Sequence, residues 1–165
     1  MANVKTETNV VPIRAPAAAK RVCDKKWGAD VMAQNYCMVP SLLLRAQRRL
    51  GLSAQQLALI IHLCDFWWYD DKLPWPKKET LAERLGLTEK QIQRIVRALE
   101  ERGYLQRIRR TTRHGQTSNG YDLSGLAEKL QELAPEFAEA KAAKRNVERR
   151  GGIAPAARKA HKTAG

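Results

Sequence analysis

Long hydrogen-bonding side chains recur through residues 89–102 at helical spacing. The apolar positions of this segment recur at steps of three and four, which predicts a helix with one buried stripe; they are Ile92, Ile95, Val96 and Leu99. The opposite face and its flanks carry cations and amides, namely Lys90, Gln91, Gln93, Arg94 and Arg97. In the major groove of DNA, arginine can donate two hydrogen bonds to guanine, and glutamine can pair with adenine. We therefore expect this face to contact base pairs; the alternative is an ordinary solvated helix surface.

A preceding helix and a glycine turn must position that face. Residues 78–85 place Leu81, Ala82 and Leu85 on one side of a short helix. Gly86 permits a sharp turn because it lacks a Cβ, and Gly103 predicts the end of the second helix. The two segments together predict a helix-turn-helix.

The start of each helix offers groups for phosphate. Thr88 and Gln91 have the spacing of a capping box, and Thr88 with the free N–H groups of the helix start can bind a phosphate. Lys77 and Lys78 precede the first helix. We expect them beside the DNA backbone, where a point charge positions the protein without discriminating sequence.

A basic hairpin is predicted next. Residues 104–112 and 120–123 have strand character and flank the polar, turn-forming segment 113–119. This hairpin concentrates cations that suit contacts with phosphates, and Arg113 could instead enter a narrow minor groove; the residues are Arg107, Arg109, Arg110, Arg113 and His114. The alternative is that the charges only protect a strand edge, and for His114 the two interpretations stay equally open.

The region before this unit predicts supporting helices. Residues 42–50 suit a short helix, and the Ser53 to Gln56 spacing is a second capping box. It opens a helix with an apolar stripe that we expect to end between residues 68 and 71. Four aromatic residues follow or end this helix, and we expect them to form a packed corner of the core instead of a ligand cage: Trp67, Trp68, Tyr69 and Trp75. The alternative for either Trp67 or Tyr69 is exposure as a contact for a partner.

Composition limits the classes of function. The chain has 165 residues and a formal net charge of +13, which favours a polyanionic partner, nucleic acid before an anionic membrane surface. No apolar run reaches the roughly 18–20 residues of a membrane span, and the three cysteines are widely spaced. Nucleotide-binding, zinc-protease and hydrolase motifs do not occur in the sequence. We expect a cytoplasmic, nucleoid-associated protein that is not an enzyme and takes no cofactor, metal or small-molecule ligand.

Residues 73–105 resemble the winged helix-turn-helix domains of bacterial transcription regulators, especially those of plasmids and other mobile elements and of replication initiators. The segment 117–126, which closes the hairpin, resembles the same group. One departure is Lys77, which stands where such domains often have a serine cap. The resemblance implies that the hairpin is a wing, and that DNA contacts fall on Thr88, Lys90, Gln91, Gln93, Arg94, Arg97, Arg110 and Arg113.

The sequence thus predicts a mainly α fold with a small β-hairpin: a winged helix-turn-helix with a C-terminal helical extension. We expect a mobile basic N-terminal arm (1–34), the winged domain (35–126), the extension (127–150) and a disordered basic tail (151–165). That tail could add sequence-independent DNA affinity or only aid solubility.

An apolar seam in the extension bears on oligomeric state. Its members are Leu126, Leu130, Leu133, Phe137, Ala140 and Val147, and we expect Pro135 to break or kink the helix. The seam predicts a homodimer, unless it packs back on its own domain.

The function we expect is sequence-specific binding of double-stranded DNA by a transcriptional regulator. Helix 89–102 would lie in the major groove, and wing 105–123 would contact the backbone or the minor groove. The alternative is a plasmid or mobile-element replication-initiation or partition factor that uses the same domain. A third interpretation is a winged helix that binds only protein.

Overall fold

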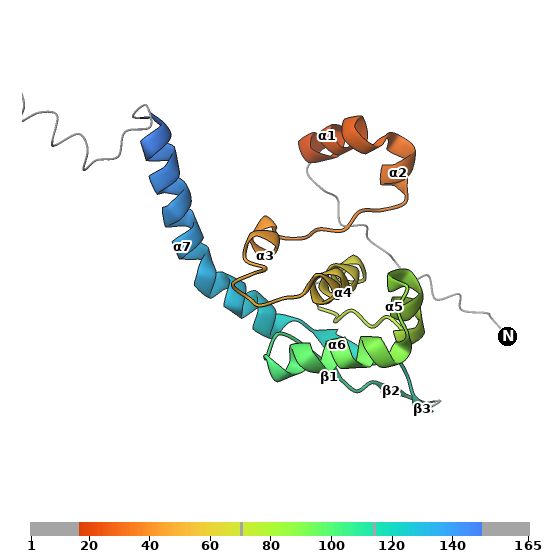
Figure 1. Cartoon of the computed structure of the whole chain (residues 1–165). Coiled ribbons are helices and arrows are strands. Elements are labelled where there is room, and N and C mark those ends of the chain that lie inside the picture. Colours follow the sequence, from red (N-terminus) through yellow and green to blue (C-terminus); the bar gives the residue numbers. More distant parts are fainter. Residues whose placement is uncertain (1–16, 70, 114, 150–165) are drawn as a thin grey trace, which may run out of the picture.

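The computed structural model describes residues 17–69, 71–113 and 115–149. The fold is mainly helical with two small antiparallel sheets, as the sequence predicted. Helices α4, α5 and α6 form a group with the strands along its lower edge, and α7 leads away from it (Figure 1). The elements, in order, are α1 Ala17–Trp27, α2 Ala29–Ala33, α3 Ser41–Arg45, α4 Ala54–Asp65, α5 Lys78–Leu85, α6 Glu89–Glu101, β1 Gln106–Ile108, β2 Thr111–Thr112, β3 Gly115–Gln116, β4 Gly120–Asp122 and α7 Ser124–Arg149.

Three helices share the core that positions the helix-turn-helix. The apolar stripe of α6 is buried as predicted, from Ile92 to Leu99. It meets the fully buried Leu81 of α5 and the buried Leu59 and Leu63 of α4. Burying one such aliphatic side chain contributes about 1.5–3 kcal/mol. This packing fixes which face of α6 is turned to solvent.

Both predicted capping boxes are present. The Ser53 amide donates to Gln56 Oε1 at 2.9 Å, and the Thr88 amide donates to Gln91 Oε1 at 2.8 Å. Between α5 and α6, Gly86 has φ of 62°, a left-handed conformation that a residue without Cβ adopts at little cost. The predicted bounds of α5 are confirmed, and α6 ends one residue earlier than predicted, with Arg102 as its C-cap.

The hairpin is more broken than the sequence predicted. β1 pairs with β4, with Arg107 opposite Tyr121, and β2 pairs with β3 at the tip. Residues 109–110 interrupt the first predicted strand, and the predicted turn 113–119 contains β3. The segment Leu73–Pro76 runs beside β4, because the Tyr121 amide donates to the Pro74 carbonyl at 2.8 Å and Ser118 Oγ donates to the Trp75 carbonyl at 2.9 Å.

The helices before the unit are shorter than predicted. α3 ends at Arg45, and residues 46–51 continue as turns. α4 ends at Asp65 because the amides of Phe66 and Trp67 bond to carbonyls three residues back, which tightens the last turn. The expectation of an aromatic corner inside the core is wrong for Trp75, which is 40% exposed, whereas Trp67, at 39%, fits the alternative of an exposed ring.

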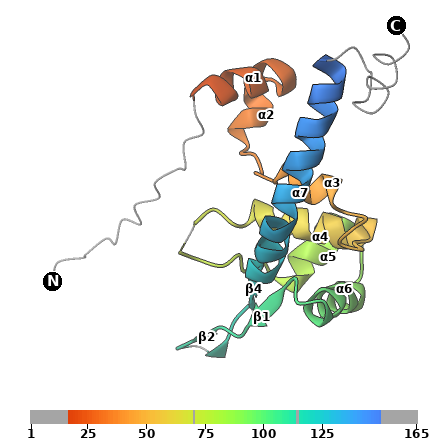
Figure 2. The same ribbon diagram turned by 90° about the vertical axis from the view of Figure 1, so that its left-hand side faces the viewer.

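The N-terminal segment contains two helices that the sequence analysis did not predict. Residues 1–16 lie outside the described residues, but 17–27 and 29–33 form α1 and α2. The Ala-rich sequence favours helix without burial, and no residue of α2 is buried. Figure 2 shows both helices away from the sheet, so this segment is a helical arm outside the core.

The C-terminal helix contradicts one expectation and favours one of two alternatives for another. α7 runs through Pro135, so the predicted break is wrong. The first part of its apolar seam, from Leu126 to Phe137, packs against the core of its own domain. Arg49 reinforces this contact through a 2.7 Å ion pair with Glu136 and a position 5.6 Å from the Phe137 ring centre. The predicted tail, 151–165, lies outside the described residues.

Candidate nucleic-acid interface

The first two turns of α6 present polar side chains to solvent. Lys90, Gln93 and Arg94 are all exposed. Within the described part of the chain, none of the three forms a hydrogen bond or ion pair. These three long side chains are therefore available for contacts on one face of the helix, as the sequence predicted.

Thr88 and Gln91, which were also predicted as DNA contacts, form hydrogen bonds with each other. Thr88 Oγ1 accepts from the Gln91 amide at 3.3 Å and donates to Gln91 Oε1 at 3.0 Å. Gln91 Oε1 also accepts from the Thr88 amide. The Gln91 carboxamide oxygen is therefore occupied by capping, which leaves its NH₂ group as the free donor.

Several cations around this face are neutralised. Lys78 Nζ lies 2.8 Å from Glu89 Oε2, and Arg97 Nε lies 3.1 Å from Glu101 Oε1. The hydrogen bond to Glu89 raises the pKa of Lys78. The Arg97 pair is highly exposed on both sides, at 77% and 64%, and such an i,i+4 pair contributes only about 0.2–0.5 kcal/mol.

The firmest ion pair joins α6 to β1. Arg107 donates to both carboxylate oxygens of Glu100, from Nε at 2.8 Å and from Nη2 at 2.6 Å. Its backbone amide donates to the same carboxylate at 3.1 Å. The side-chain hydrogen bond from Arg107 lowers the pKa of Glu100 and raises that of Arg107.

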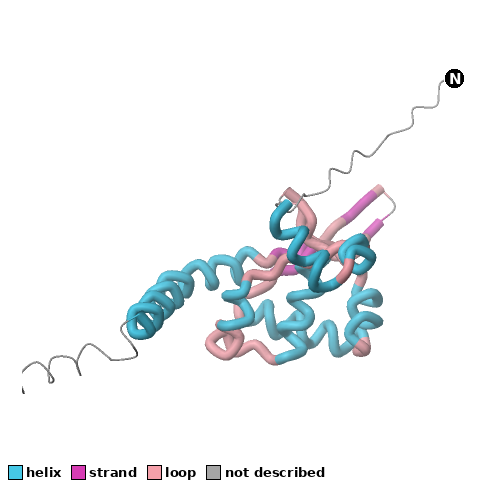
Figure 3. The backbone as a smooth tube through the Cα atoms, turned by 90° about the horizontal axis from the view of Figure 1, so that it is seen from above, coloured by secondary structure: helices cyan, strands magenta, loops and turns pink. Residues whose placement is uncertain are grey.

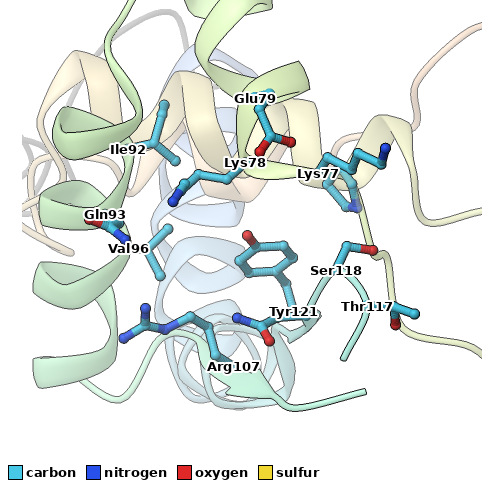
Figure 4. Close-up of a pocket in the computed structure, with 12 residues that line it drawn as sticks. Lys77, Lys78, Glu79, Ile92, Gln93, Val96, Arg107, Thr117, Ser118 and Tyr121 are labelled. Atoms are coloured by element: carbon cyan, nitrogen blue, oxygen red, sulfur yellow. The ribbon is translucent and has the colours of Figure 1, made fainter. Parts of the chain in front are cut away.

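A groove of about 540 Å³ separates α6 from the wing. Lys78 reaches across it between α6 and the Tyr121 ring, with Arg107 on the opposite wall and Ser118 at the far end (Figure 4). Burial raises the pKa of Tyr121. Lys77, the exposed N-cap of α5, borders the same groove and makes no side-chain capping bond. Asn119 Oδ1, also in the lining, is a buried acceptor without a partner among the described residues.

The cations of the wing differ in exposure. Arg109 and Arg113 are exposed, and the hairpin tip that carries Arg113 extends from the helical body (Figure 3). Arg110 is half-buried, with its guanidinium 4.7 Å from the Trp75 ring centre. His114 lies outside the described residues.

The sequence analysis did not identify three residues that take part in this site: Glu100, Tyr121 and Ser118. Glu100 and Arg107 are seven residues apart across the Gly103 turn. The two side chains come together only because β1 folds back toward the end of α6. The sequence pattern alone does not specify that arrangement. In the described residues, no group of three or more His, Cys, Asp or Glu could hold a metal ion, and no helix could cross a membrane.

These elements define a winged helix-turn-helix domain. Residues 39–141 match the DnaD N-terminal domain family, to which the chain belongs. The N-terminal domain of DnaD from Geobacillus kaustophilus HTA426 is similar in structure, with a TM-score of 0.51 and 27% identity over 71% of this chain and 96% of that one.

Two regulators give weaker structural similarity. The MarR repressor of Listeria monocytogenes 4b F2365 has a TM-score of 0.39 and 16% identity, over 89% of both chains. The MepR–DNA complex of S. aureus gives 0.38 and 16%, over 81% of this chain and 96% of that one. No curated protein matches the sequence.

Proposed function

We propose that this domain binds double-stranded DNA in a sequence-dependent way, with α6 in the major groove. The observation that carries the proposal is the open face of Lys90, Gln93 and Arg94, whose donors have no competing partner in the described chain. Arginine and glutamine are the side chains suited to base edges. The DnaD-family membership and the winged-helix topology fit this activity.

The groove beside α6 suits the phosphate backbone that separates the major groove from the minor groove. Lys77 supplies a cation without an ion-pair partner among the described residues at its border, beside Lys78, whose charge is shared with Glu89. With α6 in the major groove, the wing residues Arg109 and Arg113 would reach the backbone or the adjacent minor groove.

Two biological settings use such a domain. The sequence alone favoured a transcriptional regulator, but DnaD-family membership favours a replication-associated role. Multiple bound sites near an origin would support the replication role. A single site overlapping a promoter would support a regulator. Either role would place the protein with the nucleoid in the cytoplasm.

Selection of bound duplexes from a random library tests the proposal directly. We expect an enriched motif with wild-type protein, and loss of enrichment with the triple variant Lys90→Ala, Gln93→Ala, Arg94→Ala. The control is the double variant Lys25→Ala, Lys26→Ala. It removes the same number of positive charges, two, from exposed positions of α1, and it should still enrich the motif. Failure to enrich any motif, or equal loss in the control, would contradict sequence-dependent binding through α6.

A homodimer remains a prediction. The seam that suggested it is engaged with the chain's own core up to Phe137, so a dimer would have to use the rest of the seam, from Ala140 to Val147, or another surface. Analytical ultracentrifugation of the full chain with and without the selected duplex measures this. Monomers under both conditions would rule the dimer out.

A further inference from the structure

The wing sheet has a second face, turned away from α6. Arg107 and Tyr121 face the groove beside α6. Neighbouring residues of a strand point to opposite faces, so Ile108 and its partner Gly120 belong to the other one. A Cβ placed on Gly120 would lie 3.4 Å from Leu73 and 3.6 Å from the Arg110 side chain. The Gly120 position thus locates Leu73 and Arg110 on this outer face.

A groove of about 490 Å³ opens on that face, lined by Lys72, Leu73, Trp75 and Arg110. Trp75 is 40% exposed although it is a large aromatic residue. Hydrogen bonds from Ser118 and Tyr121 to the carbonyls of Trp75 and Pro74 fix the backbone that carries the indole to the base of the wing, and the ring itself contacts the Arg110 guanidinium. A rigid exposed ring loses little freedom when it contacts a ligand.

Two cations and one aromatic ring line this groove, and a second ring, Tyr69, lies outside it beside Lys72. The Arg110 guanidinium lies over Trp75, and Lys72 Nζ lies 4.9 Å from the Tyr69 ring centre. The lining contains no acidic side chain. Within the described residues neither Lys72 nor Arg110 forms an ion pair. Neither cation of the groove is thus held by a carboxylate of the described chain, unlike Lys78 and Arg107 on the opposite face.

We propose that this outer groove binds single-stranded DNA, with an unpaired base extending the Trp75–Arg110 stack. Unpaired bases stack on aromatic rings and on guanidinium planes, and a basic groove holds their backbone. Lys72 would contact the phosphate next to the stacked base. A base inside a duplex cannot reach such a stack, because both of its faces are covered by its neighbours. The wing then has a duplex side, facing α6, and a single-strand side.

The test is binding of the full chain to fluorescent oligo-dT of about 16 nucleotides in low salt, followed by anisotropy and by tryptophan fluorescence. We expect binding with quenching of tryptophan emission. Trp75→Ala should lower affinity by about 5- to 150-fold, the range measured for removing one stacked aromatic ring. Trp75→Phe should keep most of the affinity but lose most of the quenching.

Trp67→Ala is the matched control, because Trp67 is 39% exposed but lies in a different groove; it should leave oligo-dT binding unchanged. Arg110→Lys keeps the charge without the planar group and should weaken binding in the same direction as Trp75→Ala. Trp75→Ala should leave affinity for a duplex unchanged, whereas Arg94→Ala should lower affinity for a duplex and leave oligo-dT binding unchanged. No oligo-dT binding, equal effects of Trp75→Ala and Trp67→Ala, or full quenching in Trp75→Phe would each overturn the proposal.

Discussion

The two ends of α6 carry similar residues in different electrostatic states. In its first two turns, Lys90 and Arg94 stand in solvent without partners in the described chain. At its far end, Arg97 is paired with Glu101, and Arg107 of β1 is held by Glu100. The density of cations is comparable, but only the first group is free to contact another molecule. The availability of cations therefore identifies the candidate interface better than their number.

The largest expected effect concerns the free end. Arg94→Ala should weaken binding to the selected duplex by about 1–3 kcal/mol and relax base preference, because a bidentate arginine contact is worth that much. Arg97→Ala, the paired counterpart on the same helix, should have a clearly smaller effect. Anisotropy with specific and scrambled duplexes measures both variants. Equal losses would remove the distinction between the two ends of α6.

Replacing Lys77 tests whether a cation beside the groove contacts a DNA phosphate. Lys77→Ala should weaken specific and scrambled duplexes alike, and reduce the slope of log affinity against log salt by about one. Binding titrations over a range of salt concentrations give the slope. An unchanged slope would place Lys77 outside the interface.

Glu100→Gln converts a neutralised cation into a free one. The amide still accepts a hydrogen bond but no longer cancels the charge of Arg107, so the salt slope should become steeper by up to about one and affinity for any duplex should rise. Glu132→Gln is the control, because it frees Lys129 on α7 by the same change of charge. A similar gain in the control would mean that only net charge matters.

The smallest effect is on stability. The hydrogen bond from Arg107 lowers the pKa of Glu100 below its ordinary 4.5. A carboxyl whose folded-state pKa is depressed stabilises the protein above the unfolded-state pKa, and this contribution is lost as pH falls through the folded value. Because the pair is partly exposed, wild type should exceed Glu100→Gln by only about 0.2–1 kcal/mol at pH 7. Urea unfolding should show the difference shrinking below pH 4.5, and a constant difference would contradict this cause.

Local signals explain what the sequence predicted well. The bounds of α5, the Gly86 turn, both capping boxes and the buried stripe of α6 depend on neighbouring residues, and all four are confirmed. The exposed side of α6 follows from its stripe. The Lys90, Gln93 and Arg94 face therefore needed no knowledge of tertiary contacts.

Contacts between distant segments explain what the sequence missed. The Arg107–Glu100 pair depends on how β1 folds back along α6, and the Trp75–Arg110 contact joins residues on two separate strand-like segments. Pro135 suggested a helix break, yet the contacts of Leu133, Phe137 and Arg49 hold α7 to its own domain on both sides of that residue. Such long-range packing outweighs local preference.

The two prolines beside the wing have a consequence for how copies of this protein can crowd together on one DNA molecule. Pro74 and Pro76 have no amide hydrogen, and the carbonyls of Pro74 and Trp75 already accept bonds from β4 and Ser118. A strand arriving from another molecule would find few groups with which to continue the ladder. The β4 edge of the sheet is thereby protected from edge-to-edge pairing with a neighbouring copy.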